Sequence, residues 1–146
     1  MNIRIVVADE RDVSFFDLTQ PQGAPSSSGS LHNPAGLPDR ELESDRPGRR
    51  FGGTDGNRHA VDGERSTHRH GLELFAKEVA RTLDGARTRN EFDRLVLIAA
   101  PRMLGMLREA LPTTCRSVVA AEIPKDLIHG EIETIRDAVP RTAFFH

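Results

Sequence analysis

An uninterrupted apolar run, Leu-Val-Leu-Ile-Ala-Ala at residues 95–100, constrains the fold of this chain more than any other feature. A strand with one face in water alternates apolar and polar residues, whereas a run without alternation fits a strand buried on both faces. Such strands occur mainly in sheets whose two faces are covered by helices. We therefore interpret residues 95–100 as the central strand of an α/β domain.

Five segments predict the other strands and two of the helices that would cover the sheet. Residues 2–8 and 13–18 have the apolar pattern of strands, and the charged linker between them is typical of a hairpin turn. Pro101 suits the first turn of a helix, and residues 116–123 read as another buried strand. With a closing helix at 131–139, the predicted fold class is α/β, a mixed β-sheet with helices on its faces.

An amphipathic helix is predicted just before the central strand. Its apolar residues recur at spacings of three and four, and they are Leu72, Phe75, Ala76, Val79, Leu83 and Ala86. On the opposite face, Glu73 and Lys77 are spaced to form an (i, i+4) ion pair. Ser66 or Thr67 could cap the start of this helix, so the pattern places its first turn near residue 67.

Residues 19–70 contain few apolar residues and many that break regular structure. We expect a mobile loop at 19–45, with room for a short edge strand near Leu31. Residues 46–70 form a Gly-, Arg- and His-rich loop with six basic and three acidic side chains, a net charge of +3. The rest of the chain is acidic or neutral, at -5 for residues 1–45 and 0 for residues 71–146.

The length of 146 residues fits a single domain, residues 1–146. The lone Cys115 cannot form an internal disulfide, and the sequence shows neither a signal peptide nor an apolar stretch of about 20 residues. We therefore expect a cytoplasmic protein that does not contact a membrane. Apolar edges on the strands of the opening hairpin would allow a homodimer.

The loop at 46–70 holds the candidate binding residues. Its glycines permit close approach of the backbone to a ligand, and its arginines could contact phosphates. A solvated surface loop is the alternative, since the loop has no Walker pattern and only Phe51 to stack on a base. The predicted RNA-binding positions are Arg49, Arg50, Gly52, Gly53, Thr54, Arg58, His59, Arg65 and Arg69.

Other reactive side chains have simpler interpretations. His68 and His70 would diverge at a helix start, so we predict no metal site, and no cofactor motif is present. Cys115 has no neighbouring base in the sequence and fits a small core residue better than a nucleophile. Glu122, Asp126 and Lys125 lie at a predicted strand-to-helix junction, where they could do acid-base work or simply be exposed charges.

Five stretches, taken in chain order, carry a resemblance to a known family: residues 6–18, 33–49, 74–87, 92–111 and 118–129. On these stretches the chain resembles the bacterial host-attachment family, described as proteins required for attachment to host cells. That family is similar to the central domain of archaeal and eukaryotic class I peptide-chain release factors. In those factors a GGQ loop precedes a long helix and reaches the peptidyl-transferase centre, where its glutamine lies beside the ester to be hydrolysed.

The resemblance implies a binding role more strongly than a catalytic one. Gly52 and Gly53 correspond to the two glycines and Arg58 to a basic position of the loop, but Thr54 stands at the position of the glutamine. We therefore expect a non-catalytic module that engages RNA, with the ribosome or tRNA as partner. One alternative is an intracellular protein-interaction factor that affects attachment or biofilm formation. A weaker one is a hydrolase acting at the loop, with Thr54, Asp55 or His59 assisting water.

Overall fold

The computed structural model describes residues 1–34 and 54–145, with the backbone alone over residues 54–66. Five strands and their helices follow one another along the chain. The elements in order are β1 (Ile3–Ala8), β2 (Asp12–Leu18), β3 (Ser26–His32), α2 (Thr54–Thr88), β4 (Arg94–Ala99), α3 (Pro101–Ala110), α4 (Thr113–Arg116), β5 (Val119–Ile123), α5 (Ile132–Ala138) and the 3₁₀ helix η2 (Arg141–Phe144).

The strands form one mixed sheet in the order β3-β2-β1-β4-β5. β1 pairs with β2, and β2 with β3, in antiparallel fashion, whereas β4 runs parallel to both β1 and β5. The predicted fold class and the opening hairpin are thus confirmed. Residues 95–99 of the apolar run are buried as expected, but β1 occupies the middle of the sheet and β4 lies beside it. Strands that are buried on both faces share the same apolar pattern. The pattern therefore does not indicate which of them lies in the middle of the sheet.

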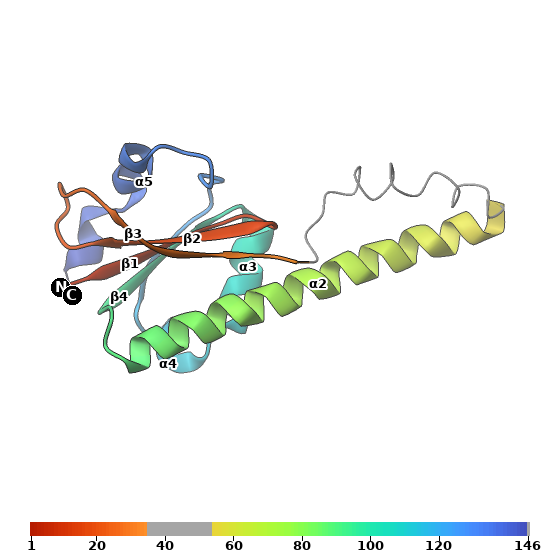
Figure 1. Ribbon diagram of the computed structural model, residues 1–146, viewed down its shortest axis with the longest axis horizontal. Coiled ribbons are helices and arrows are strands. Elements are labelled where there is room, and N and C mark those ends of the chain that lie inside the picture. Colours follow the sequence, from red (N-terminus) through yellow and green to blue (C-terminus); the bar gives the residue numbers. More distant parts are fainter. Residues whose placement is uncertain (35–53, 146) are drawn as a thin grey trace.

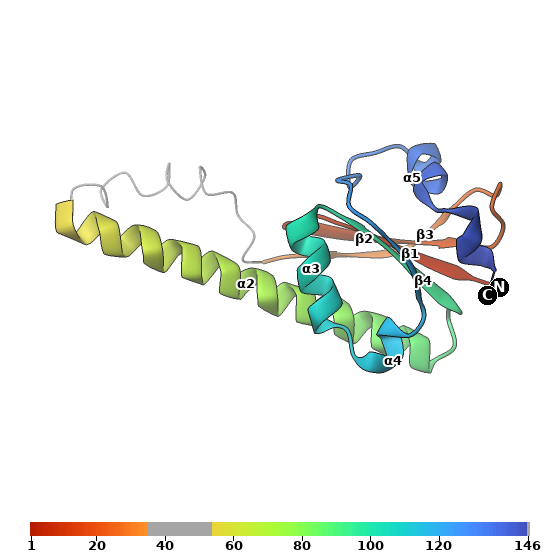
Figure 2. The same ribbon diagram turned by 180° about the vertical axis from the view of Figure 1, so that it is seen from behind.

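Helices cover the two faces of the sheet unequally (Figures 1 and 2). α2, α3 and α4 pack on one face, where Val6, Phe15 and Leu97 of the sheet meet Phe75 and Leu107 of the helices. α5 and η2 cover the other face, around Ile5, Val96, Ile98 and Ile135. Because successive strand residues point to opposite faces, β1 and β4 supply apolar side chains to both cores.

The sheet edges differ from the predicted ones. Part of the predicted loop at 19–45 is strand β3, which includes the edge strand expected near Leu31. Since β3 and β4 flank the opening hairpin, neither hairpin strand lies at an edge, and the argument for a dimer through those edges is wrong. Residues 35–45 lie outside the described part.

The region predicted as a buried strand at 116–123 is divided between two elements. Residues 113–116 form the short helix α4, and the strand β5 begins at Val119 and is only half-buried because it ends the sheet. Cys115 therefore lies in a helix, with its side chain fully buried in the core. Burial raises the pKa of its thiol, and a hydrogen bond from the thiol to Asp84 raises it further.

Native protein should therefore react very slowly with an aromatic disulfide reagent at neutral pH. The thiolate is the reacting species. The raised pKa of Cys115 keeps the fraction of thiolate low, and burial keeps the sulfur away from the reagent. In urea sufficient for unfolding, one equivalent of thiol should react promptly. Rapid labelling of the native protein, at the rate seen in urea, would contradict this placement of Cys115.

Helix α2 is the largest departure from the sequence prediction. It begins at Thr54, whereas residues 46–70 were predicted as a loop, so Ser66 and Thr67 lie inside the helix and do not cap it. Packing of the predicted apolar stripe against the sheet stabilises the inner turns of α2. The outer turns extend from this existing helix, so they do not bear the cost of nucleating a new one. Glycines weaken such an extension by about 1 kcal/mol each without ending it.

Candidate nucleic-acid interface on helix α2

The outer part of α2 projects beyond the sheet (Figure 1). We call residues 54–67 the arm, since they precede His68, which contacts the β1–β2 turn. At a rise of about 1.5 Å per residue the arm is about 20 Å long. The 46–70 segment is thus in part a helical extension that starts directly after the two glycines.

The structure places only some of the predicted RNA-binding positions. Arg49, Arg50, Gly52 and Gly53 lie outside the described residues. Thr54 is the first residue of α2, and its backbone and those of Arg58, His59 and Arg65 follow the arm. Arg69 is the only one of these positions with a described side chain: it is exposed, and its Nε lies 3.3 Å from Oε1 of Glu73. Glu73 was predicted to pair with Lys77 and pairs with Arg69 instead.

The positive charge of this segment is concentrated ahead of the helix. Residues 46–53 carry three arginines and no acidic residue, whereas residues 54–70 carry three arginines and three carboxylates. The net charge of +3 therefore belongs to the stretch that leads into the outer end of α2. The first turn of a helix also presents free backbone N–H groups and the positive end of the helix dipole, which favour anions.

Three elements meet at the base of the arm. Glu10, in the turn after β1, places Oε2 3.4 Å from Nε2 of His68 on α2 and Oε1 3.5 Å from Nη1 of Arg102 on α3. The turn is held by Asp9, whose Oδ1 accepts hydrogen bonds from the backbone N–H groups of Arg11 and Asp12 at 2.8 and 2.7 Å. Glu10 thus links both helices to the sheet where the arm leaves it. No spacing in the sequence indicates this contact.

His68 and His70 of α2 do not converge. His68 turns toward Glu10 with a quarter of its side chain exposed, while His70 is exposed to solvent two positions further along the helix. Residues at (i, i+2) lie on different sides of a helix, so the two imidazoles cannot share one ion. Over residues 1–34 and 67–145, no group of three or more His, Cys, Asp or Glu side chains is placed to hold a metal.

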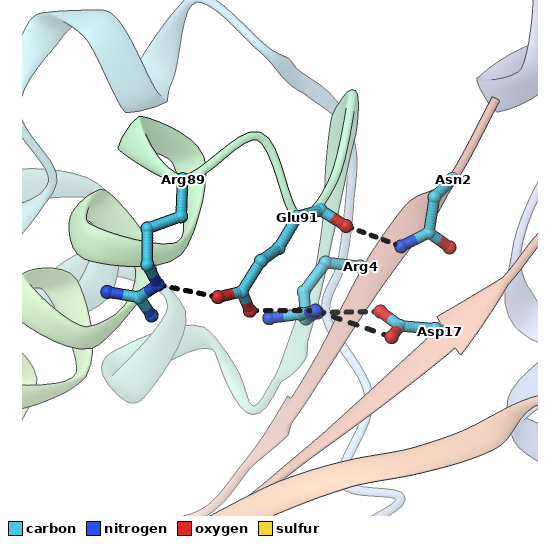
Figure 3. Close-up of polar contacts among 5 residues, drawn as sticks. All are labelled: Asn2, Arg4, Asp17, Arg89 and Glu91. Atoms are coloured by element: carbon cyan, nitrogen blue, oxygen red, sulfur yellow. Dashed lines mark hydrogen bonds and ion pairs between the residues drawn. The ribbon is translucent and has the colours of Figure 1, made fainter.

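A charge network around the buried Arg4 lies at the other end of α2 (Figure 3). Arg4 of β1 has a side chain only 8% exposed, and its Nε lies 2.7 Å from Oδ1 of Asp17 on β2. Its Nη2 lies 3.5 Å from Oε1 of Glu91, just after α2, and its guanidinium stacks over the ring of Phe92. A hydrogen bond from Arg89, aided by the charges of Arg89 and Arg4, lowers the pKa of Glu91.

At the strand-to-helix junction after β5, one of the predicted acidic residues already has an ion-pair partner. Glu122 forms an ion pair with Arg108 of α3, and this partner raises the pKa of the guanidinium through its hydrogen bond and its charge. Lys125 and Asp126 are exposed beside it. These contacts favour the interpretation of the junction as surface charges over a site for acid-base work.

Comparison with known proteins identifies the family. A family model described as "Protein required for attachment to host cells" matches residues 4–139. The chain belongs to this family. A Rickettsia prowazekii (strain Madrid E) relative named "Uncharacterized protein RP470" is 33% identical over 66 residues, which are 44% of this chain and 44% of that protein. The chain thus matches less than half the length of this relative.

The fold of this host-attachment family member is similar to that of a translation factor. The crystal structure of the archaeal translation termination factor aRF1 superposes with a TM-score of 0.52 at 8% sequence identity. The match covers 98% of this chain and 36% of that one, so the chain spans about a third of the termination factor. The predicted release-factor-like fold is therefore confirmed. In the parts of the chain described by the structure, no helix is long and apolar enough to cross a membrane.

Proposed function

We propose that this host-attachment family member is a non-catalytic RNA-binding module that engages the ribosome or tRNA through its basic segment, residues 46–70. The observation that carries the proposal is the combination of a helical arm projecting from the sheet with an arginine-rich stretch directly ahead of it. A projecting element can reach into a nucleic-acid groove that the compact sheet cannot enter. The arginines that precede it in the sequence would supply phosphate contacts.

The fold likeness supports the direction of this proposal. The archaeal protein that shares the fold is a translation termination factor, and translation takes place on RNA. Binding is favoured over catalysis because Thr54 stands at the glutamine position in the release-factor resemblance. A threonine hydroxyl does not offer the amide donor and acceptor pair of a glutamine.

Binding of fluorescein-labelled tRNA, measured by fluorescence anisotropy over a series of salt concentrations, tests the proposal. Wild-type protein should bind with an affinity that falls steeply as salt rises, because phosphate contacts release counterions. The double variant Arg49→Gln/Arg50→Gln should bind about tenfold or more weakly, and the slope of log affinity against log salt should decrease by about 2. Co-sedimentation with purified ribosomes should weaken in parallel.

A matched variant controls for net charge. Lys125 and Arg141 are exposed outside α2, and neither has an ion-pair partner among the residues that the structure describes. Lys125→Gln/Arg141→Gln removes the same two positive charges and should bind tRNA nearly as wild type does. Absence of salt-sensitive binding by the wild-type protein, to both tRNA and ribosomes, would refute the proposed function.

The family description supports a second candidate, a protein-interaction factor that affects attachment to host cells. Affinity purification from native extract, with and without ribonuclease, separates the two. RNA-dependent recovery of ribosomal proteins supports the RNA-binding module. A protein partner that is retained after ribonuclease treatment supports the interaction factor.

A further inference from the structure

The solvent-facing side of α2 carries a row of basic side chains that was not among the predicted binding positions. His70, Lys77 and Arg81 recur at intervals of seven and four residues, which places them on one face of the helix. All three are exposed, and they lie opposite the apolar stripe that packs on the sheet. Leu74, half-exposed at 52%, lies between His70 and Lys77 on the same face.

Ion pairing separates Lys77 and Arg81 from most arginines in the described part of the chain. Within residues 1–34 and 67–145, seven arginines form ion pairs with carboxylates: Arg4, Arg69, Arg87, Arg89, Arg102, Arg108 and Arg136. Lys77 and Arg81 have no such partner in the described part of the chain. Glu73, the carboxylate best spaced to neutralise Lys77, is engaged by Arg69 instead. A ligand that binds this row therefore has no internal ion pair to displace.

The geometry of the row fits a nucleic-acid backbone. Along the helix axis His70 and Lys77 are about 10 Å apart, and Lys77 and Arg81 about 6 Å apart. Repeated phosphates offer negative charges at comparable spacing, and contacts to them do not depend on base sequence. The row is also continuous with the arm, since all of these residues belong to the same uninterrupted helix (Figure 2).

We propose that the exposed face of α2 formed by His70, Lys77 and Arg81 is a second RNA contact, which binds backbone phosphates as RNA continues from the arm along the helix. This inference rests on the proposed RNA-binding function and extends it to residues beyond the 46–70 segment. It implies a bound RNA that contacts the body of the protein as well as the tip of the arm.

Three double variants, each lacking two positive charges, test the inference with one fluorescein-labelled RNA hairpin. Lys77→Gln/Arg81→Gln should reduce affinity about fivefold to tenfold and lower the salt slope by about 1 to 2. Lys125→Gln/Arg141→Gln should leave both quantities near the wild-type values. Arg49→Gln/Arg50→Gln reports on the proposed function separately. Glutamine is a good helix former, and both α2 positions are exposed, so the variant should keep its fold.

The outcomes distinguish the two proposals. If the arginine variant loses affinity while Lys77→Gln/Arg81→Gln matches the control, the second contact is refuted and the proposed function stands. If wild-type protein binds no RNA, both are refuted. Binding of poly-glutamate that is lost in Lys77→Gln/Arg81→Gln, with RNA binding retained, would assign the row to an acidic protein partner and overturn the inference.

Discussion

Replacement of Phe75 by alanine should lower the free energy of unfolding by about 3–5 kcal/mol. Phe75 is 2% exposed and lies in the core between α2 and the sheet, among Val6, Phe15 and Leu97. Truncation to alanine removes the apolar ring and leaves a cavity that a well-packed core fills only in part. A loss of this size is a large share of the 5–15 kcal/mol by which domains are usually stable.

Leu74 provides a matched control at the neighbouring position. Its side chain is 52% exposed on the opposite side of the same helix, so Leu74→Ala should change the free energy of unfolding by less than about 0.5 kcal/mol. Urea denaturation followed by far-ultraviolet circular dichroism measures both variants. Equal losses in the two variants would show that α2 does not bury the face that the structure assigns to the core.

Asp17→Ala is expected to have the second largest effect, a loss of about 2–4 kcal/mol in the free energy of unfolding. Asp17 is the carboxylate closest to the buried guanidinium of Arg4. Its removal would leave a charge in the core with only the more distant Glu91 as counterion. Because Glu91 remains as a counterion, we expect a smaller loss of stability than the full cost of breaking a buried ion pair.

Two comparison variants test whether the loss of stability in Asp17→Ala comes from the burial of the Arg4 charge. Glu73→Ala breaks the exposed pair with Arg69 and should cost less than about 1 kcal/mol, because water screens both charges. Arg4→Met/Asp17→Leu removes both charges together and should recover most of the stability lost in Asp17→Ala. The same urea titration reports all three. If Asp17→Ala and Glu73→Ala lose equal stability, the Arg4 network is not buried as described.

Both predictions concern the anchoring of α2, on which the proposed function depends. Phe75 anchors the middle of the helix, and the Arg4 network ties the loop after its last turn to β1 and β2. The arm has no sheet beneath it, so its direction is set by these inner contacts and by Glu10 at its base. Destabilising variants should therefore weaken RNA binding indirectly, which is why the binding tests avoid the residues of the core.

Much of the fold was predictable because burial leaves a periodic pattern in the sequence. The apolar residues of β1, the alternation in β2, the unbroken run of β4 and the three-four spacing of Leu72 to Ala86 each record which side chains face a core. These patterns are local, and they determined the elements and the fold class. They also indicated the arginines and glycines of the 46–70 segment as candidates, by composition alone.

The tertiary structure decided the features that depend on residues far apart in the chain. The order of the strands depends on which buried edges meet, and the pairs Arg4 with Glu91 and Glu10 with His68 join residues far apart in the chain. The start of α2 at Thr54 also escaped prediction, because its polar outer turns carry no apolar stripe and extend from a nucleus formed by packing further along. The sequence therefore determined the buried elements and the charge of the 46–70 segment. The packing of α2 on the sheet decided that part of this segment is a helical arm, and that Lys77 and Arg81 further along the same helix face solvent.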